Sequence, residues 1–268
     1  MQDLSARYPF WLCDIWGVVH NGVASFPKAL HALRRHRENG GVVALLTNAP
    51  RSADKVRNHL ATLAVTAEHY DLIVTSGDVT RALMTPYAGR PIHYVGPDRD
   101  LGMLDGLELA NVPVEKAEAV LCVGLVDDTT ETPADYEDAL RAMRGRGLKM
   151  ICANPDKVVR RGDRLIYCAG ALAARYTELG GEVTMAGKPA APIYELAFKK
   201  LAELAQKPVG KDMVLAIGDG PETDIRGAAE FGLATVLFAG GISELGIDPE
   251  QLKADVRAKF PHAKIVRS

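Results

Sequence analysis

The sequence predicts a doubly wound α/β fold with a parallel sheet and a second α/β domain inserted into it. Short apolar runs alternate with helical patterns, as in FWLCD followed by PKALHALRRHREN and GVVALLTN followed by SADKVRNHLATL. Glycine or proline stands at the junctions, which is typical of successive βαβ units. The length of 268 residues exceeds that of most single domains and leaves room for the insertion.

Two breaks in this alternation predict the domain boundaries. The turn-rich stretch TPYAGRP ends the first series near Pro91, and Gly180-Gly181 marks a second break. Between them IHYVG, EAVLCVG and KMICAN are typical of strands, and Thr132-Pro133 is typical of a helix start. We expect a core domain of residues 1–87 and 181–268 and an inserted domain of residues 88–180.

The composition excludes several classes of protein. Hydrophobic residues make up 47% of the chain and charged residues 25%, without an apolar run near the length of a membrane span. The segment MQDLSARYPF is not typical of a secretory signal, so we expect a cytoplasmic protein without membrane partners. The net charge of -2 gives no reason to expect nucleic acid as a partner. Four separated cysteines without a C-x-x-C pair are expected to be reduced core residues: Cys13, Cys122, Cys152 and Cys168.

Polar residues follow several of the predicted strands. In parallel α/β sheets the carboxyl ends of the strands are where ligands bind. A single aspartate at a strand end is usually a helix cap, but several polar strand ends together favour one shared site. These residues are Asp14, the pair Thr47 and Asn48, Lys188, and Asp219 with Asp224.

Each of these residue types has a role in phosphoryl chemistry. A carboxylate can attack phosphorus and form an aspartyl-phosphate, which divides a difficult hydrolysis into two easier steps. A second cluster of carboxylates suits Mg²⁺, which prefers oxygen ligands and neutralises phosphate charge. A lysine, a threonine and an asparagine can donate hydrogen bonds to phosphoryl oxygens. The clusters therefore predict Mg²⁺-dependent chemistry on a small phosphorylated substrate.

Four motifs in order resemble the haloacid dehalogenase-like superfamily: D-x-x-G-V-V from Asp14, LLTN, GKP and GDGPETDI. The long insertion between the second and third motifs is similar to the IIA branch, whose members carry a large α/β cap. That branch includes p-nitrophenyl phosphatase-like and nucleotide monophosphatase-like proteins. The resemblance implies a phosphatase with a Rossmann-like core, a cap domain and Mg²⁺ as cofactor.

The resemblance also implies roles for individual residues. Asp14 would be the nucleophile and a metal ligand, and the backbone carbonyl of Trp16 would be a second ligand. Asp224 would support the metal, or instead cap the helix that follows it. The implied catalytic residues are Asp14, Lys188 and Thr47, the metal residues are Asp14, Trp16, Asp219 and Asp224, and the substrate-binding candidates are Asn48, Gly17, Arg51, Asn154, Asp156 and Gly170.

Trp16 departs from the family pattern. Family phosphatases usually have an aspartate two residues after the nucleophile, where it protonates the leaving oxygen and later activates water. An indole offers only an N–H donor and cannot do either, and a positioned acid or base contributes about 10²–10⁴-fold in rate. The loss should be greatest for alkyl phosphates. His20 on the same loop is a candidate substitute because its ordinary pKa lies near neutrality, although a lone loop histidine is more often solvent-facing or capping.

Three interpretations therefore stay open. We favour a phosphohydrolase that acts on esters with good leaving groups or uses a substitute acid. A second interpretation is a catalytically weak or inactive protein that binds a phosphorylated metabolite as a sensor or partner, with the indole stacked on the ligand or plugging the site. The third, a phosphorylated signalling domain, needs far less chain. Sugar phosphates and nucleotide monophosphates are both compatible substrates, and a homodimer is compatible with the sequence.

Overall fold

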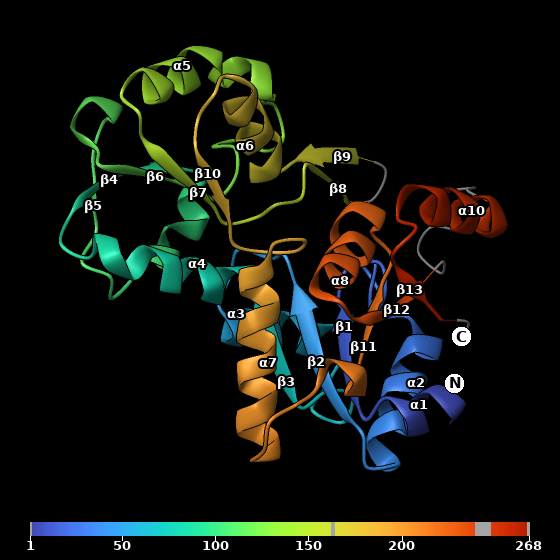
Figure 1. Ribbon diagram of the computed structural model, residues 1–268. Helices are drawn as coiled ribbons and strands as arrows, with labels where there is room; N and C mark the ends of the chain where they lie inside the picture. Colours follow the sequence, from blue (N-terminus) through green and yellow to red (C-terminus); the bar gives the residue numbers. More distant parts are fainter. Residues whose placement is uncertain (1, 162–163, 239–247, 267–268) are drawn as a thin grey trace. The chain divides into compact units, whose positions relative to one another are not determined.

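The structure is a computed structural model that describes residues 2–161, 164–238 and 248–266. Contacts divide the chain into two compact units, each with its own sheet (Figure 1). The chain leaves the first unit and returns to it twice. The first unit contains Met1–Thr47, Asp54–Val74 and Lys188–Ser268, and the second contains Asn48–Ala53 and Thr75–Gly187.

The first sheet has six strands: β1 (Phe10–Asp14), β2 (Val42–Thr47), β3 (Leu72–Thr75), β11 (Val214–Gly218), β12 (Ala234–Leu237) and β13 (Lys264–Ile265). Their order is β13-β12-β11-β1-β2-β3. β1 runs parallel to both β2 and β11, and β11 runs parallel to β12. Every residue of β1 and β11 is buried, because a parallel sheet covered on both faces leaves neither face exposed to solvent. The predicted parallel sheet is confirmed.

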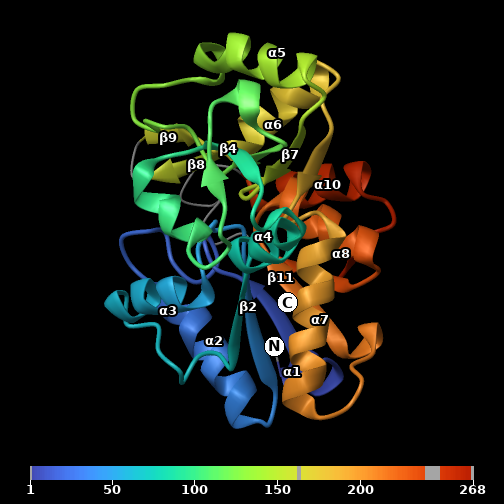
Figure 2. The same ribbon diagram turned by 90° about the vertical axis from the view of Figure 1, so that its left-hand side faces the viewer.

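The helices of this unit are α1 (Gln2–Arg7), α2 (Pro27–Glu38), α3 (Ala53–Thr62), α7 (Ala191–Ala205), α8 (Arg226–Phe231) and α10 (Pro249–Lys259), with short 3₁₀ and π turns at Lys211–Met213 and Pro221–Ile225. α2 and α3 lie on one face of the sheet, and α7 and α8 lie on the other (Figure 2). Pro27 occupies the first turn of α2. Backbone N–H groups in the first turn have no partner within the helix, so the lack of an amide hydrogen in proline costs no hydrogen bond there. Among the residues that the structure describes, no helix has the length and apolarity needed to cross a bilayer.

The second sheet has five strands: β4 (Pro91–Val95), β5 (Ala110–Asn111), β6 (Ala119–Cys122), β7 (Lys149–Cys152) and β10 (Val183–Met185). They pair in parallel in the order β10-β7-β6-β4-β5. A separate antiparallel hairpin joins β8 (Val158–Arg161) to β9 (Arg164–Tyr167). The helices are α4 (Ser76–Met84), α5 (Glu137–Gly145) and α6 (Ala169–Glu178), with 3₁₀ turns at Thr85–Tyr87, Asp98–Leu104, Val114–Lys116 and Pro133–Tyr136. The predicted helix start at Thr132 is a capping box that opens the last of these turns.

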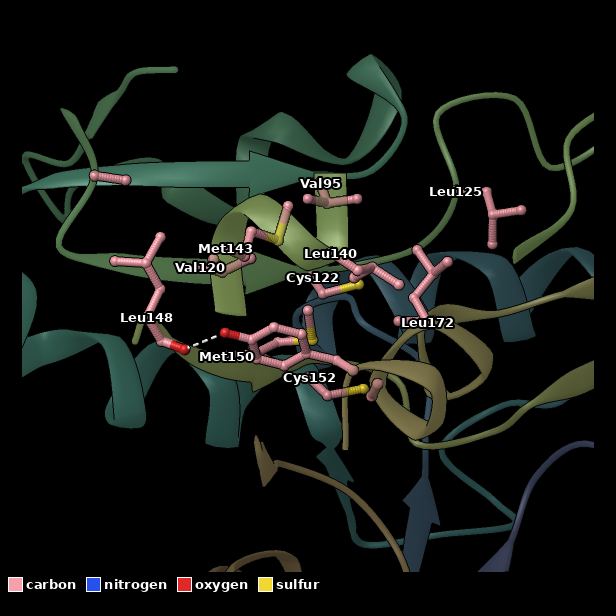
Figure 3. Packing of buried hydrophobic residues seen from close by; sticks show 14 residues of the cluster. Val95, Val120, Cys122, Leu125, Leu140, Met143, Leu148, Met150, Cys152 and Leu172 are labelled. Carbon is pink, nitrogen blue, oxygen red and sulfur yellow. Dashed lines mark hydrogen bonds between the residues drawn. The ribbon is translucent and has the colours of Figure 1, made fainter. Parts of the chain in front are cut away.

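Alternate residues of β6 enter two buried apolar clusters, because successive side chains of a strand point to opposite faces. Val120 and Cys122 pack in the cluster that includes Leu140 of α5 and Leu172 of α6 (Figure 3). Cys122 lies directly opposite Cys152 on the neighbouring strand. All four cysteines are free and buried, as predicted. Burial raises the pKa of the Cys152 thiol to about 12, which disfavours the reactive thiolate.

The compact second unit is larger than the inserted domain expected at residues 88–180. α4 belongs to it because the Ser76 hydroxyl donates a 2.6 Å hydrogen bond to the carbonyl of Ala153. β10 belongs to it because Val183 pairs with Met150 of β7. Turn signals in the sequence mark where the chain bends, but these two tertiary contacts extend the unit to Thr75 and Gly187.

His36 is a buried histidine in the first unit. Its ring stacks on Trp11 with centroids 3.9 Å apart, and its Nδ1 lies 2.6 Å from the hydroxyl of Ser5. Burial lowers the pKa of His36 to about 4, against an ordinary value of 6.5. The folded chain therefore holds the imidazole neutral at pH values where the unfolded chain binds a proton.

We expect the free energy of unfolding to fall as the pH decreases from 6.5 to 4, with His36 contributing roughly 3 kcal/mol of the loss. Urea denaturation at several pH values measures this, and the fluorescence of Trp11 and Trp16 reports the first unit, which holds both tryptophans. The control is His36→Phe, which keeps a ring on Trp11 but cannot titrate. An equally steep pH dependence in this variant would contradict the assignment.

Candidate active site

Asp14 is the last residue of β1, and the loop that follows it turns sharply at Gly17. Gly17 has a φ of +85°, which favours glycine, and a Cβ atom there would lie 2.0 Å from Oδ2 of Asp219. The side chain of Asp219 therefore occupies the space that only a glycine leaves. This close approach joins the loop after β1 to the residue directly after β11.

Lys188 lies at the centre of a buried charge cluster. Its side chain is 3% exposed, and Nζ donates hydrogen bonds to Oδ1 of Asp14, to Oδ1 of Asp224 at 2.8 Å and to the carbonyl of Leu46 at 3.1 Å. Burial by itself would lower the pKa of Lys188, but the charges of Asp14 and Asp224 reverse this effect and raise it well above its ordinary value. The lysine is therefore a fixed positive charge.

Three carboxylates converge beside this lysine. Asp14, Asp219 and Asp224 each offer an oxygen, and these atoms all lie within 4.8 Å of one another. Burial first, and then the charges of Asp224 and Asp219, raise the pKa of Asp14 against the opposing charge of Lys188. One lysine cannot balance three carboxylates, and an all-oxygen donor set is the kind that Mg²⁺ or Ca²⁺ prefers. The residues present therefore fit a divalent cation.

Asp224 does not cap the helix that follows it. α8 begins at Arg226 and has Ile225 at its N-cap without a side-chain hydrogen bond. The Asp224 carboxylate instead accepts hydrogen bonds from Lys188 and, at 3.1 Å, from the backbone N–H of Gly220. These two bonds hold it in the charge cluster.

Several of the candidate substrate-binding residues meet within the second unit. Nδ2 of Asn48 donates to Oδ1 of Asp156 at 2.9 Å, and Oδ1 of Asn154 accepts from the backbone N–H of Asp156 at 3.1 Å. The N–H of Gly170 donates to the carbonyl of Asp156 at 3.1 Å. A Cβ at Gly170 would lie 2.1 Å from the carbonyl oxygen of Pro155, so this glycine admits the loop against the start of α6.

Arg51 and Thr47 stand in different settings. Arg51 pairs with Asp100, with 3.6 Å between Nε and Oδ1, and its side chain is about half exposed. The structure therefore pairs Arg51 with Asp100, which the sequence did not identify as a candidate site residue. Thr47 is buried at the end of β2, one residue beyond Leu46, which is the register partner of Asp14.

His20 is buried rather than solvent-facing. Its Nδ1 accepts a 2.9 Å hydrogen bond from the N–H of Gly22, and its ring contacts those of Trp16 and His59. Burial first, and the nearby His59 second, lower the pKa of His20 to about 4. The imidazole is therefore neutral near pH 7, which argues against His20 as the substitute acid. The sequence carried no signal for His59, because its contact with His20 joins segments far apart in the chain.

The fold and the charge cluster define a parallel α/β protein with a polar site at the carboxyl ends of its central strands. Two family models match this chain: haloacid dehalogenase-like hydrolase over residues 11–110 and HAD-hydrolase-like over residues 185–266. A crystal structure of a haloacid dehalogenase-like family hydrolase from Brucella suis 1330 is 47% identical, with a TM-score of 0.86, and the match covers 90% of this chain and 88% of that one. The chain belongs to the haloacid dehalogenase-like hydrolases, which confirms the resemblance.

More distant relatives have named activities. The D-glycerol 3-phosphate phosphatase of Mycobacterium tuberculosis is 27% identical over 247 residues, which are 91% of this chain and 66% of that protein. A crystal structure of glycerol phosphate phosphatase from the same organism in complex with magnesium is 25% identical, with a TM-score of 0.65, and the match covers 87% of this chain and 68% of that one. This chain thus spans just under two thirds of the length of the first relative.

Proposed function

We propose that the protein is a Mg²⁺-dependent phosphatase that acts on a small phosphorylated metabolite. The observation that carries the proposal is the buried cluster of Lys188 with Asp14 and Asp224, joined by Asp219 within 4.8 Å. The phosphatase names of the mycobacterial relatives and the magnesium bound in one of their structures support it.

In this proposal Asp14 attacks phosphorus and carries the phosphoryl group until water releases it. Lys188 holds the Asp14 carboxylate in place and balances its charge, and the Thr47 hydroxyl donates to a phosphoryl oxygen. Asp14, Asp219 and the carbonyl of Trp16 would hold Mg²⁺, with Asp224 in support. When bound, the ion neutralises the phosphoryl oxygens and so lets one anion approach another.

Substrate selection is proposed to depend on the second unit, which would act as the cap domain. The loop from Asn154 to Asp156 is held by Asn48 and Gly170, so its polar groups have a defined arrangement. Arg51 would also contact substrate if it exchanged Asp100 for a phosphorylated ligand, and Gly17 would contribute backbone next to Asp219. The side-chain contacts of Asn48, Arg51, Asn154 and Asp156 are testable by the effect of alanine variants on KM.

We expect the wild type to release phosphate from p-nitrophenyl phosphate and from some metabolite monophosphates in the presence of Mg²⁺. Asp219→Asn should raise the Mg²⁺ concentration for half-maximal rate by roughly tenfold to 100-fold, because it removes one charged ligand. Titration of the rate against Mg²⁺ measures the shift. Asp212→Asn, at an exposed aspartate of the same unit, is the matched control. An unchanged Mg²⁺ requirement in Asp219→Asn would remove that residue from the metal site.

The main alternative is a protein that binds a phosphorylated metabolite without turnover. Trp16 motivates it, since the indole stands where related phosphatases have an acid. Tight, Mg²⁺-dependent binding of a monophosphate without phosphate release would favour this alternative. Turnover at rates typical of enzymes, on the order of 1 per second or more, would exclude it.

A further inference from the structure

Trp16 is the one exposed residue of the described segment from Phe10 to His20. The residue is 38% exposed, although both neighbours in sequence are buried. It follows Asp14 by two positions, and no acidic residue stands between Asp14 and His20. A single exposed apolar residue needs no explanation by itself, so the question is how firmly this ring is held.

Two residues contact the indole, His20 and Gly22, and His59, which is distant in the sequence, contacts His20. We call these four residues the Trp16 shelf: Trp16, His20, Gly22 and His59. A Cβ atom on Gly22 would lie 2.4 Å from Cη2 of the indole, so the ring fills the space that this glycine leaves. His20 contacts the indole edge to face, with centroids 5.2 Å apart and planes at 74°. His59 supports His20 in the same manner at 5.7 Å and 87°.

This arrangement prepares the ring for a ligand. The N–H of Gly22 also donates to Nδ1 of His20 at 2.9 Å, which orients the imidazole that supports the indole. A partly exposed aromatic ring that is already immobilised loses little side-chain entropy when a ligand packs on it. Planar rings prefer offset-stacked or edge-to-face contacts with such a surface.

Given the proposed function, the absence of an acidic residue at position 16 adds a second requirement for the ligand that packs on the indole. When Asp14 attacks, the bond from its oxygen to phosphorus forms and the bond from phosphorus to the leaving oxygen breaks. The electron pair stays on the leaving oxygen without a proton, because the indole cannot supply one. Only a leaving group that stabilises this negative charge departs quickly. In the second step, a water oxygen attacks phosphorus, the electron pair returns to Asp14, and the water proton passes to solvent.

We propose that the Trp16 shelf binds the leaving group, and that the preferred substrates are phosphate esters of planar, conjugated hydroxyl groups, either phenols or enols. Conjugation makes the leaving oxygen a stable anion, and planarity lets the same group stack on the indole. This proposal rests on the proposed phosphatase function and adds the chemical class of the substrate.

The turnover test compares an aryl phosphate with a fluoroalkyl phosphate whose alcohol has the same pKa as the phenol. We expect the wild type and Trp16→Phe to prefer the aryl ester in kcat/KM by roughly tenfold, and Trp16→Leu to lose that preference. A preference that survives unchanged in Trp16→Leu would overturn the role of the ring. If the wild type hydrolyses neither ester nor any of the metabolite monophosphates, the proposed function is wrong. The binding test then shows separately whether the Trp16 shelf binds a planar group.

The binding test needs no turnover. Isothermal titration calorimetry with Mg²⁺ compares phenylphosphonate with cyclohexylphosphonate, which have rings of similar size but only one of them planar. We expect the wild type to bind phenylphosphonate roughly tenfold more tightly and Trp16→Leu to bind both equally. Leu204→Ala, at another exposed apolar residue of the first unit, should retain the wild-type preference. Equal or undetectable binding of both compounds by the wild type would overturn the proposal.

Discussion

Asp14→Asn is expected to abolish phosphate release, with a loss on the order of 10⁴-fold or more in kcat/KM. The amide is a poor nucleophile and cannot carry the phosphoryl group, whereas its size keeps the contact with Lys188. Phosphate release from p-nitrophenyl phosphate measures the loss. Acid-quenched mass spectrometry should find a phosphorylated Asp14 peptide in the wild type and not in the variant.

The matched control for this experiment is Asp54→Asn, because Asp54 is an exposed aspartate of the same unit. It should retain the wild-type rate. Thermal denaturation of Asp14→Asn should show a cooperative transition, since Lys188 keeps its hydrogen bonds to Asp224 and Leu46. Wild-type phosphate release by a folded Asp14→Asn variant would refute Asp14 as nucleophile.

Trp16→Asp is expected to raise kcat/KM for alkyl phosphates by about 10²-fold or more, because it introduces a carboxyl group at the position where the family resemblance implies an acid. Aryl phosphates should gain much less, since their leaving oxygens depart without a proton. Steady-state kinetics on paired alkyl and aryl phosphates measures the difference. The pH–rate profile of Trp16→Asp on alkyl phosphates should show the ionisation of an acidic group that the wild-type profile lacks.

Trp16→Asn is the control for this gain, because it has the size of aspartate but no transferable proton. An equal gain in Trp16→Asn would mean that the indole merely obstructs the substrate. No gain in either variant would mean that another residue already supplies the proton. The pair therefore separates acid catalysis from access.

The sequence predicted the parallel core because buried strands require continuous apolar runs, and the helical pattern PKALHALRRHREN corresponds to α2. It was less informative about the limits of the second unit. The contact of Ser76 with Ala153 and the pairing of β10 with β7 are made by residues far apart in the chain. The periodicity of apolar residues is a local property of the sequence and does not indicate such contacts.

The charge cluster was predictable for a related reason. Asp14 ends β1 and Asp219 directly follows β11, and because these strands are parallel neighbours, topology brings both residues to the same edge of the sheet. The surroundings of Trp16 were not predictable in this way. The environment of His20 includes a hydrogen bond from Gly22 and the ring of His59 in α3, and a motif in the sequence does not specify either.

The packing of Trp16 on Gly22 has an evolutionary consequence. Gly22 has a φ of +88°, a conformation that asparagine also tolerates. The Cβ of an asparagine at this position would nevertheless lie 2.4 Å from Cη2 of the indole. Contact with the ring therefore excludes asparagine, although the backbone conformation would allow it. Among homologues, positions 16 and 22 should therefore covary. A residue other than glycine at position 22 should appear only where position 16 carries a shorter side chain.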